Sequence, residues 1–161
     1  MNPQDRRRTA RDLLRYIDAS PSPWHAVSNA VADLERRGFE RLREEEPWDL
    51  HPGRAYYVVR DDSSLIAFRV GDAPLQQAGF RIVGAHTDSP GFRVKPHAAH
   101  AKGPLTTLGV EVYGGPILAT FADRDLTLAG RVFVRDPESA TGVAPRLVHF
   151  EKPIVRLPNL A

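Results

Sequence analysis

The sequence predicts an α/β protein whose first part combines helices with strands and whose last part is rich in β-strands. Three observations indicate this class. Apolar residues recur at helical spacing in two segments before residue 38. Beyond Pro90 the apolar runs are short and separated by Gly and Pro, which is typical of strands. The length of 161 residues allows a core of ordinary domain size. We place a domain boundary near residues 93–96, which divides the chain into 1–93 and 94–161.

Two amphipathic helices are predicted near the N-terminus, each with apolar residues at i, i+3, i+4 and i+7. In the first, these residues are Ala10, Leu13, Leu14 and Ile17. The second has Ser22 as its N-cap and Pro23 at its first helical position, where a missing N–H costs nothing. Its apolar residues repeat through 27–34, and Gly38 follows its last turn.

A β-hairpin and a buried strand are predicted next. Residues 55–60 and 65–70 are β-rich runs joined by a polar turn, which favours a hairpin. Residues 80–85 form a nearly continuous apolar run, as expected for a strand buried on both faces. Because this run ends at His86, we expect His86 at the carboxyl end of a strand, where open α/β sheets bind ligands. Further strands are predicted at 110–113, 126–134 and 147–156.

Composition excludes several classes of function. The chain has no cysteine, so disulfides, thiolate metal sites and cysteine nucleophiles are excluded, and any metal must bind His, Asp or Glu. The net charge of +2 is spread among many acids, which argues against a nucleic-acid partner. No apolar run approaches the ~18 residues that span a bilayer, and the N-terminus lacks a secretory pattern. We therefore expect no membrane partner and a cytoplasmic location.

The segment around His86 carries the most chemical information. His86 and Asp88 are two apart, so in extended chain they project to the same side. A zinc-binding imidazole normally donates its second ring N–H to a carboxylate or carbonyl, which fixes its tautomer. His86 as ligand and Asp88 as its supporting carboxylate fit this need. Spacing alone leaves the alternative open, because many His-x-Asp triplets are ordinary hydrogen-bonded turns.

Other candidates are given structural roles. His97 and His100 could share a metal on a helix, but they lie in a segment typical of a solvated loop without a nearby carboxylate. His25 and His149 also lack a local carboxylate. The acids at 44–46 are typical of a solvated surface. The Asp-Arg-Asp run at 123–125 is typical of an ion-pair network that supports folding or assembly. The glycines at 114–115 are typical of a turn.

Residues 84–90 read GAHTDSP, which resembles the metal-binding motif of the M18 (aspartyl aminopeptidase-like) family of zinc aminopeptidases. Four further stretches resemble the same family, in the same order along the chain. They are ASPSPWHAV at 19–27; Arg60 with SSLIAF at 63–68; VYGG at 112–115 with DRDL at 123–126 and LAGRV at 128–132; and EKPI at 151–154 with LPNLA at 157–161.

The resemblance implies a two-zinc hydrolase that removes N-terminal, often acidic, residues from peptides and works as a homo-oligomer. Residues 1–93 would form the first half of a zinc-exopeptidase α/β domain, and residues 94–161 would begin a β-rich inserted assembly domain. His86 would bind one zinc ion, and Asp88 would act in the active site by orienting it. Cobalt or manganese would suit such a mixed site as well, so zinc is inferred from the family.

The resemblance also implies that most of the site is absent from this chain. The family's other ligands and its general-base glutamate lie beyond the position of Ala161, so the 161-residue chain alone is expected to be inactive. The alternative hypothesis is a non-catalytic fragment or assembly module built on the β-rich part.

Overall fold

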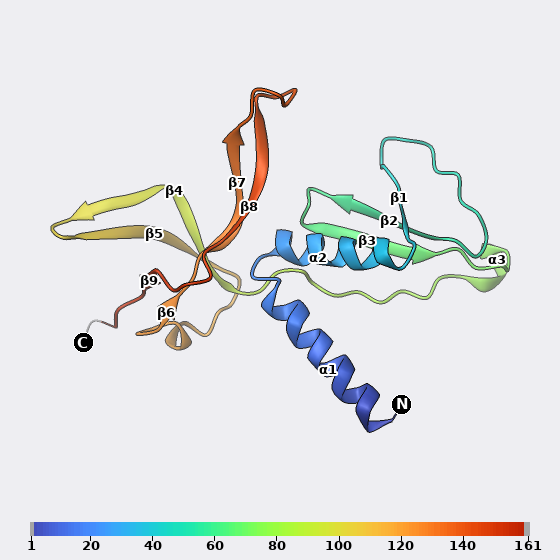
Figure 1. Ribbon diagram of the computed structural model, residues 1–161, viewed down its shortest axis with the longest axis horizontal. Coiled ribbons are helices and arrows are strands. Elements are labelled where there is room, and N and C mark those ends of the chain that lie inside the picture. The colour runs from blue at the N-terminus through green and yellow to red at the C-terminus, as the bar shows by residue number, and fades with distance from the viewer. Residues whose placement is uncertain (1, 160–161) are drawn as a thin grey trace. The chain divides into compact units, whose positions relative to one another are not determined.

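The computed structural model describes residues 2–159, which form two compact units (Figure 1). Unit 1 combines the chain up to Thr87 with residues 129–149, and unit 2 combines residues 88–128 with the chain from Phe150 onward. Helices and strands are both present, as the predicted α/β class requires. The predicted domains 1–93 and 94–161 stay a prediction. No helix within residues 2–159 has the length and apolar character needed to cross a membrane.

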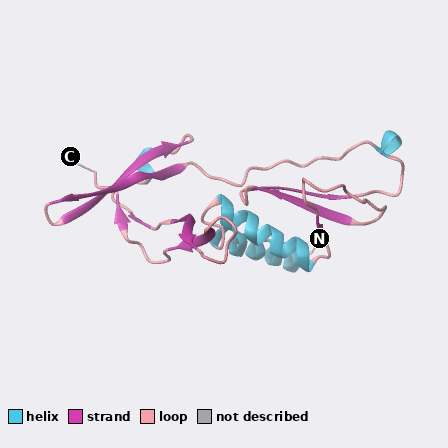
Figure 2. Cartoon of the chain, turned by 90° about the horizontal axis from the view of Figure 1, so that it is seen from above, coloured by secondary structure: helices cyan, strands magenta, loops and turns pink. Residues whose placement is uncertain are grey.

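Unit 1 contains a helical pair, a three-stranded sheet and a separate hairpin. In the sheet, the order is β1-β2-β3, with β1 parallel and β3 antiparallel to β2. Helix α2 packs against this sheet and against β7 (Figures 1 and 2). The elements are α1 (Pro3–Asp18), α2 (Pro23–Arg36), β1 (Glu40–Arg41), β2 (Ala55–Arg60), β3 (Ser64–Arg69), α3 (Leu75–Ala78), β7 (Ala129–Arg135) and β8 (Val143–His149).

Both predicted N-terminal helices are confirmed, and their ends follow from local chemistry. The Asn2 side chain accepts a hydrogen bond from the Asp5 N–H at 2.8 Å and so caps α1. Ser22 caps α2, with Pro23 in the first turn as predicted. The helices are joined by the Tyr16 hydroxyl, which donates to the Ala26 carbonyl at 2.9 Å. This bond satisfies a polar group at their junction.

The core of unit 1 lies between α2 and β2. The predicted hairpin is confirmed, with β2 paired to β3 from Ala55↔Arg69 to Arg60↔Ser64. Four consecutive residues of β2 are buried, which shows that both faces of this central strand are covered. The buried residues of the unit are Ala26, Val27, Ala55, Tyr56, Tyr57 and Val58.

Unit 2 is built on a long antiparallel hairpin, β4 (Gly91–Lys102) with β5 (Leu105–Tyr113). The pairing register shifts between Val94 and Ala99, where His97 adopts φ 53°. The extra residues there form an irregularity of the kind that bends a strand. The other elements are the 3₁₀ turn η1 (Leu118–Thr120) and the short pair β6 (Asp125–Leu126) with β9 (Val155–Arg156).

The buried strand predicted at 80–85 is wrong. These residues form no strand; in Figures 1 and 2 the chain leaves α3 as an extended loop. Phe80, Ile82 and Val83 are 75%, 84% and 99% exposed. The physical reason is that a strand needs a neighbour to bind its backbone groups, and within residues 2–159 no strand pairs with this segment. His86 therefore does not end a strand here.

Two further predictions need correction. The segment of His97 and His100 is part of strand β4, although both side chains are exposed to solvent as expected. Cross-strand bonds to β5 form this strand, and the local composition gives no sign of that remote partner. The strands predicted at 126–134 and 147–156 each occur as two shorter strands, β6 with β7 and β8 with β9, because the chain crosses between the two units at these points.

We predict that Tyr57 makes unfolding of unit 1 sensitive to alkaline pH. Burial and the hydrogen bond from its hydroxyl to Glu35 at 2.6 Å raise the pKa of Tyr57 to about 12. The unfolded chain would release this proton near pH ~10, so stability is full below that pH and falls as pH rises toward about 12.

Urea unfolding of the chain and of Tyr57→Phe checks this prediction. The variant should lose about 1 kcal/mol at neutral pH, the usual net value of one hydrogen bond. Its stability should then decline less than that of the wild type between pH ~10 and ~12. Parallel decline of the two proteins would contradict the assignment.

Candidate functional site

Thr87, the central residue of the segment 84–90, is anchored by its side chain within unit 1. The Thr87 hydroxyl donates to the Ser63 carbonyl at 2.8 Å, and Ser63 lies in the turn between β2 and β3. Thr87 is half-buried, whereas the preceding His86 is exposed. The imidazole predicted as a metal ligand is thus accessible to solvent, and its neighbour in the chain is anchored to the hairpin.

The turn that accepts this bond is itself supported from β7. Asp61 and Asp62 occupy the left-handed region, with φ 51° and 53°, a conformation that short polar side chains tolerate best. The Arg131 guanidinium binds both carboxylates, at 3.2 Å to Asp61 and 3.3 Å to Asp62, and its side chain is only 13% exposed. It also lies 5.1 Å from the ring centre of Trp24 on α2. Arg131 therefore ties the hairpin turn to the start of α2.

Asp88 has a partner in unit 2 that sequence reasoning missed. The Tyr113 hydroxyl donates to Oδ2 of Asp88 at 2.5 Å, and the two side chains are both half-buried. The hydrogen bond to the Asp88 carboxylate raises the pKa of Tyr113, and the negative charge of that carboxylate raises it further. The phenol therefore remains a donor. The Arg93 guanidinium stacks on the ring of Tyr113, 3.6 Å from its centre. Tyr113 was noted only within a family motif, because no spacing rule links residues 25 apart.

The histidines at 25 and 149 lie together in unit 1, although no pattern in the sequence pairs them. Their ring centres are 6.1 Å apart, and Nδ1 of His25 is 2.7 Å from the Ser22 hydroxyl at the N-cap of α2. Burial lowers the pKa of His25, and the charge of His149 lowers it further. A neutral imidazole hydrogen-bonded to the N-cap serves the helix end, which agrees with the structural role expected of His25.

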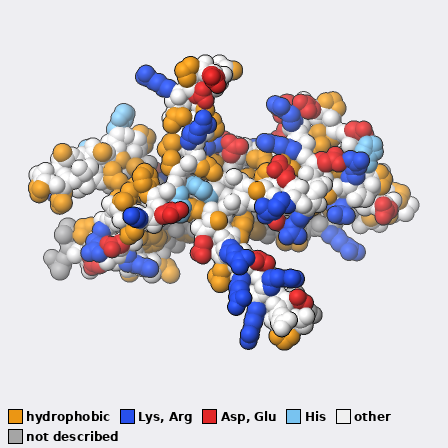
Figure 3. All heavy atoms as spheres, viewed as in Figure 1, with side chains coloured by type: hydrophobic (Ala, Val, Ile, Leu, Met, Phe, Trp, Pro, Cys, Tyr) orange, Lys and Arg blue, Asp and Glu red, His pale blue; other side chains and the backbone are white. Residues whose placement is uncertain are grey.

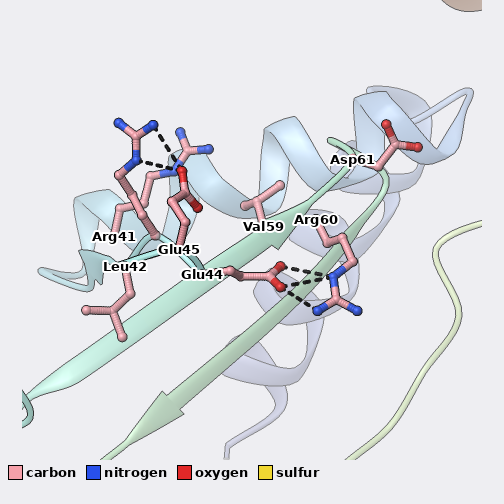
Figure 4. A pocket seen from close by; sticks show the side chains of 8 residues that line it. Arg41, Leu42, Glu44, Glu45, Val59, Arg60 and Asp61 are labelled. Atoms are coloured by element: carbon pink, nitrogen blue, oxygen red, sulfur yellow. Dashed lines mark hydrogen bonds and ion pairs between the residues drawn. The ribbon is translucent and has the colours of Figure 1, made fainter. Parts of the chain in front are cut away.

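A pocket of about 590 Å³ lies elsewhere, beside β1 and the end of β2 (Figure 4). Its acids are already bound to arginines: Glu44 to Arg60, and Glu45 to Arg43 at 3.1 Å. The side chains of Arg43, Glu45 and Arg60 are largely exposed and that of Glu44 is 35% exposed, so these pairs contribute little to stability. The pocket is lined by Arg41, Leu42, Arg43, Glu44, Glu45, Val59, Arg60 and Asp61. The pairing of Glu44 and Glu45 with arginines agrees with the solvated surface predicted for the acids at 44–46.

The Asp-Arg-Asp run at 123–125 is exposed, so it is not a buried network. It supports the fold through two contacts. Asp123 accepts from the Asn159 N–H at 3.0 Å, and Asp125 binds Arg156 across the β6–β9 pair at 2.5 Å. The predicted fold-supporting role is therefore consistent with these contacts, and neither aspartate lies with a histidine in a potential metal site among residues 2–159.

The donor set present fits part of a zinc site. An accessible imidazole at His86, followed two residues later by a carboxylate held by Tyr113, suits a ligand and its support. A catalytic zinc normally binds three protein ligands and a water. Within residues 2–159, no group of three or more His, Cys, Asp or Glu could hold a metal. The described residues therefore do not form a complete site of this kind by themselves.

A family model and curated relatives indicate the same family for this chain. The family model described as "Aminopeptidase I zinc metalloprotease (M18)" matches residues 16–161. The "Probable M18 family aminopeptidase 2" of Stutzerimonas stutzeri strain A1501 is 47% identical over 150 residues, covering 92% of this chain and 34% of that protein. The corresponding protein of Pseudomonas aeruginosa strain LESB58 is 49% identical over 150 residues, with the same coverage. The chain spans about a third of the length of these curated relatives.

Solved structures share the fold. The chain of an Ape4 and Nbr1 complex superposes with a TM-score of 0.87 at 42% identity, covering 94% of this chain and 29% of that chain. Chaetomium thermophilum mApe1 superposes with a TM-score of 0.86 at 34% identity, and the match covers 94% of this chain and 34% of that chain. The S. cerevisiae mApe1 dodecamer superposes with a TM-score of 0.86 at 25% identity, and the match covers 94% of this chain and 36% of that chain.

Proposed function

Because this chain belongs to the M18 family of aminopeptidase I zinc metalloproteases, we propose that it supplies the N-terminal third of an aminopeptidase that releases N-terminal residues from peptides. We call the polypeptide in which the remaining two thirds of the family's length follow it the complete enzyme. The observation that carries the proposal is the accessible His86 beside the anchored Thr87 and the held Asp88. Acidic N-terminal residues are the proposed preference.

In the proposed mechanism His86 binds a metal ion through one ring nitrogen. Asp88 accepts the other ring N–H, which sets the tautomer and the direction of the ligating nitrogen. Two zinc ions, when bound, would polarise the scissile carbonyl and make a water nucleophilic at neutral pH. The anchoring of Thr87 to Ser63 supports this role, because a metal ligand in a loop needs a fixed neighbour to hold its direction.

We further propose that the complete enzyme is a cytoplasmic homo-oligomer whose assembly uses residues 94–161. Two observations support this. One solved relative is a dodecamer. The two hairpins β4–β5 and β7–β8 carry exposed apolar side chains (Figure 3), among them Leu105, Val112 and Phe133 at 67%, 56% and 62% exposure. The absence of cysteine suits a reducing compartment.

The test is activity and metal content of the complete enzyme. Purified protein should hydrolyse peptides at their N-terminal residue, lose activity on dialysis against a chelator and regain it with zinc. A matched peptide with an acetylated N-terminus should resist cleavage, because an aminopeptidase binds the free amine. Cleavage of both peptides, or activity that survives metal removal, would reject the proposal.

For the 161-residue chain alone we predict no aminopeptidase activity and no stoichiometric zinc at micromolar concentration. Within residues 2–159 no group of three or more His, Cys, Asp or Glu could hold a metal, so His86 with Asp88 in support would not complete a shell of three protein ligands. We also expect association into oligomers, because residues such as Ile82 and Val83 expose apolar surface. Elemental analysis after dialysis against zinc, with light scattering, tests both parts. A monodisperse monomer with two zinc ions per chain would contradict both parts, because it would show that the 161-residue chain contains a complete metal site.

A further inference from the structure

We propose that Tyr113 is a positioning residue for Asp88, and that Arg93 holds Tyr113 in place for this task. The inference rests on the proposed function, in which Asp88 orients the metal ligand His86. It adds a residue from the β4–β5 hairpin to the support of the site. The argument depends on three contacts in unit 2 and on what each fixes.

The first contact fixes the carboxyl group. Asp88 is half-buried, and its Oδ2 accepts a hydrogen bond from the Tyr113 hydroxyl at 2.5 Å. The carboxyl group of an aspartate turns readily about its last torsion, which has broad energy wells. A phenol that holds one oxygen also sets the direction of the other oxygen. The hydrogen bond therefore selects the orientation in which Asp88 presents itself to its remaining neighbours.

The second contact fixes the phenol. Tyr113 is the last residue of β5 and pairs with Gly91 at the start of β4. Arg93 lies two residues further along β4, so it is the diagonal neighbour of Tyr113 on the same face of the hairpin. Its guanidinium lies 3.6 Å from the centre of the ring. A planar cation on the ring limits its rotation and leaves the hydroxyl pointing along the ring edge toward Asp88.

The third contact fixes the chain between the two partners. Gly114 has φ 69°, and a side chain at this position would come within 3.4 Å of Pro90. The turn after Tyr113 thus passes closely over Pro90, the last residue of the motif. Together with the Gly91↔Tyr113 pair, this close approach brings two segments 25 residues apart to one place. The phenol reaches Asp88 because the hairpin returns there.

The test uses Tyr113→Phe in the complete enzyme, because phenylalanine keeps the ring and its stacking with Arg93 and removes only the donor. We expect zinc affinity, measured by chelator competition, or kcat to fall ~10-fold or more, within the ~10–100-fold range for a lost supporting partner. The matched control is Tyr16→Phe, whose hydroxyl binds the Ala26 carbonyl on α2. It should leave both quantities unchanged.

A double-mutant cycle separates positioning from general packing. If Tyr113 acts through Asp88, then Tyr113→Phe should have little further effect in an Asp88→Ala background, where no carboxyl group is left for the phenol to hold, so the two changes should be strongly non-additive. Additive effects, or a Tyr113→Phe protein as active and as metal-bound as the wild type, would overturn the proposal.

A readout without metal keeps this inference distinct from the proposed function. Crystal structures of the wild type and of Tyr113→Phe should show the Asp88 carboxyl in different orientations. An unchanged carboxyl in the variant would overturn the positioning role even if the enzyme is a zinc aminopeptidase. A rotated carboxyl in a protein that neither binds zinc nor cleaves peptides would reject the proposed function and leave the role of Tyr113 standing.

Discussion

Replacing His86 with alanine is expected to abolish the peptidase activity of the complete enzyme and to lower the occupancy of one metal site. A catalytic zinc held by three protein ligands cannot lose one of them and keep its geometry. We expect activity to fall by more than the ~100-fold upper range for loss of a supporting partner. Initial rates on a peptide substrate and metal content by elemental analysis measure the two effects on the same sample.

The control for this variant is the pair His97→Ala and His100→Ala. Both side chains are exposed on strand β4, and the proposed mechanism gives them no role. The double variant should therefore retain nearly full activity and metal. Loss of one zinc ion per subunit in this control would show that the ligand was assigned to the wrong histidine.

The second large effect is expected for Asp88→Asn, which should lose ~10–100-fold in activity while much of the metal remains bound. The amide preserves the size of the side chain and can still accept from Tyr113 through its oxygen. In the proposed mechanism, it removes the negative charge with which Asp88 would accept the His86 ring N–H and set its tautomer. The expected signature is therefore a loss in kcat that exceeds the loss of metal.

A matched replacement elsewhere shows whether this loss is specific. Asp33 lies on α2 and pairs with Arg37 at 2.6 Å and Arg36 at 3.1 Å. These partners lower the pKa of its carboxyl, yet the pairs are exposed and contribute little to stability. Asp33→Asn should leave kcat unchanged. Full activity with Asp88→Asn would remove Asp88 from the proposed mechanism.

Local chemistry in the sequence determined the helices and the first hairpin. Ser22 and Pro23 mark the start of α2 because capping and proline geometry act within a few residues. The β-rich runs on either side of the turn at 61–63 pair in register because a short turn brings them together at little entropic cost. The position of His86 and Asp88 in a family motif was also visible from the sequence, and the family is confirmed.

Contacts between distant segments were decided by the tertiary structure alone. The apolar run at 80–85 predicts a buried strand, but strand formation depends on a partner, and residues 2–159 supply none. The segment of His97 was expected to be a loop, yet it is a strand because β5 pairs with it. Tyr113 reaches Asp88, and Arg131 reaches the turn at Asp61, only because the chain returns to these places. Such pairings leave no periodic pattern in a single sequence, since they depend on surfaces that only the folded chain brings together.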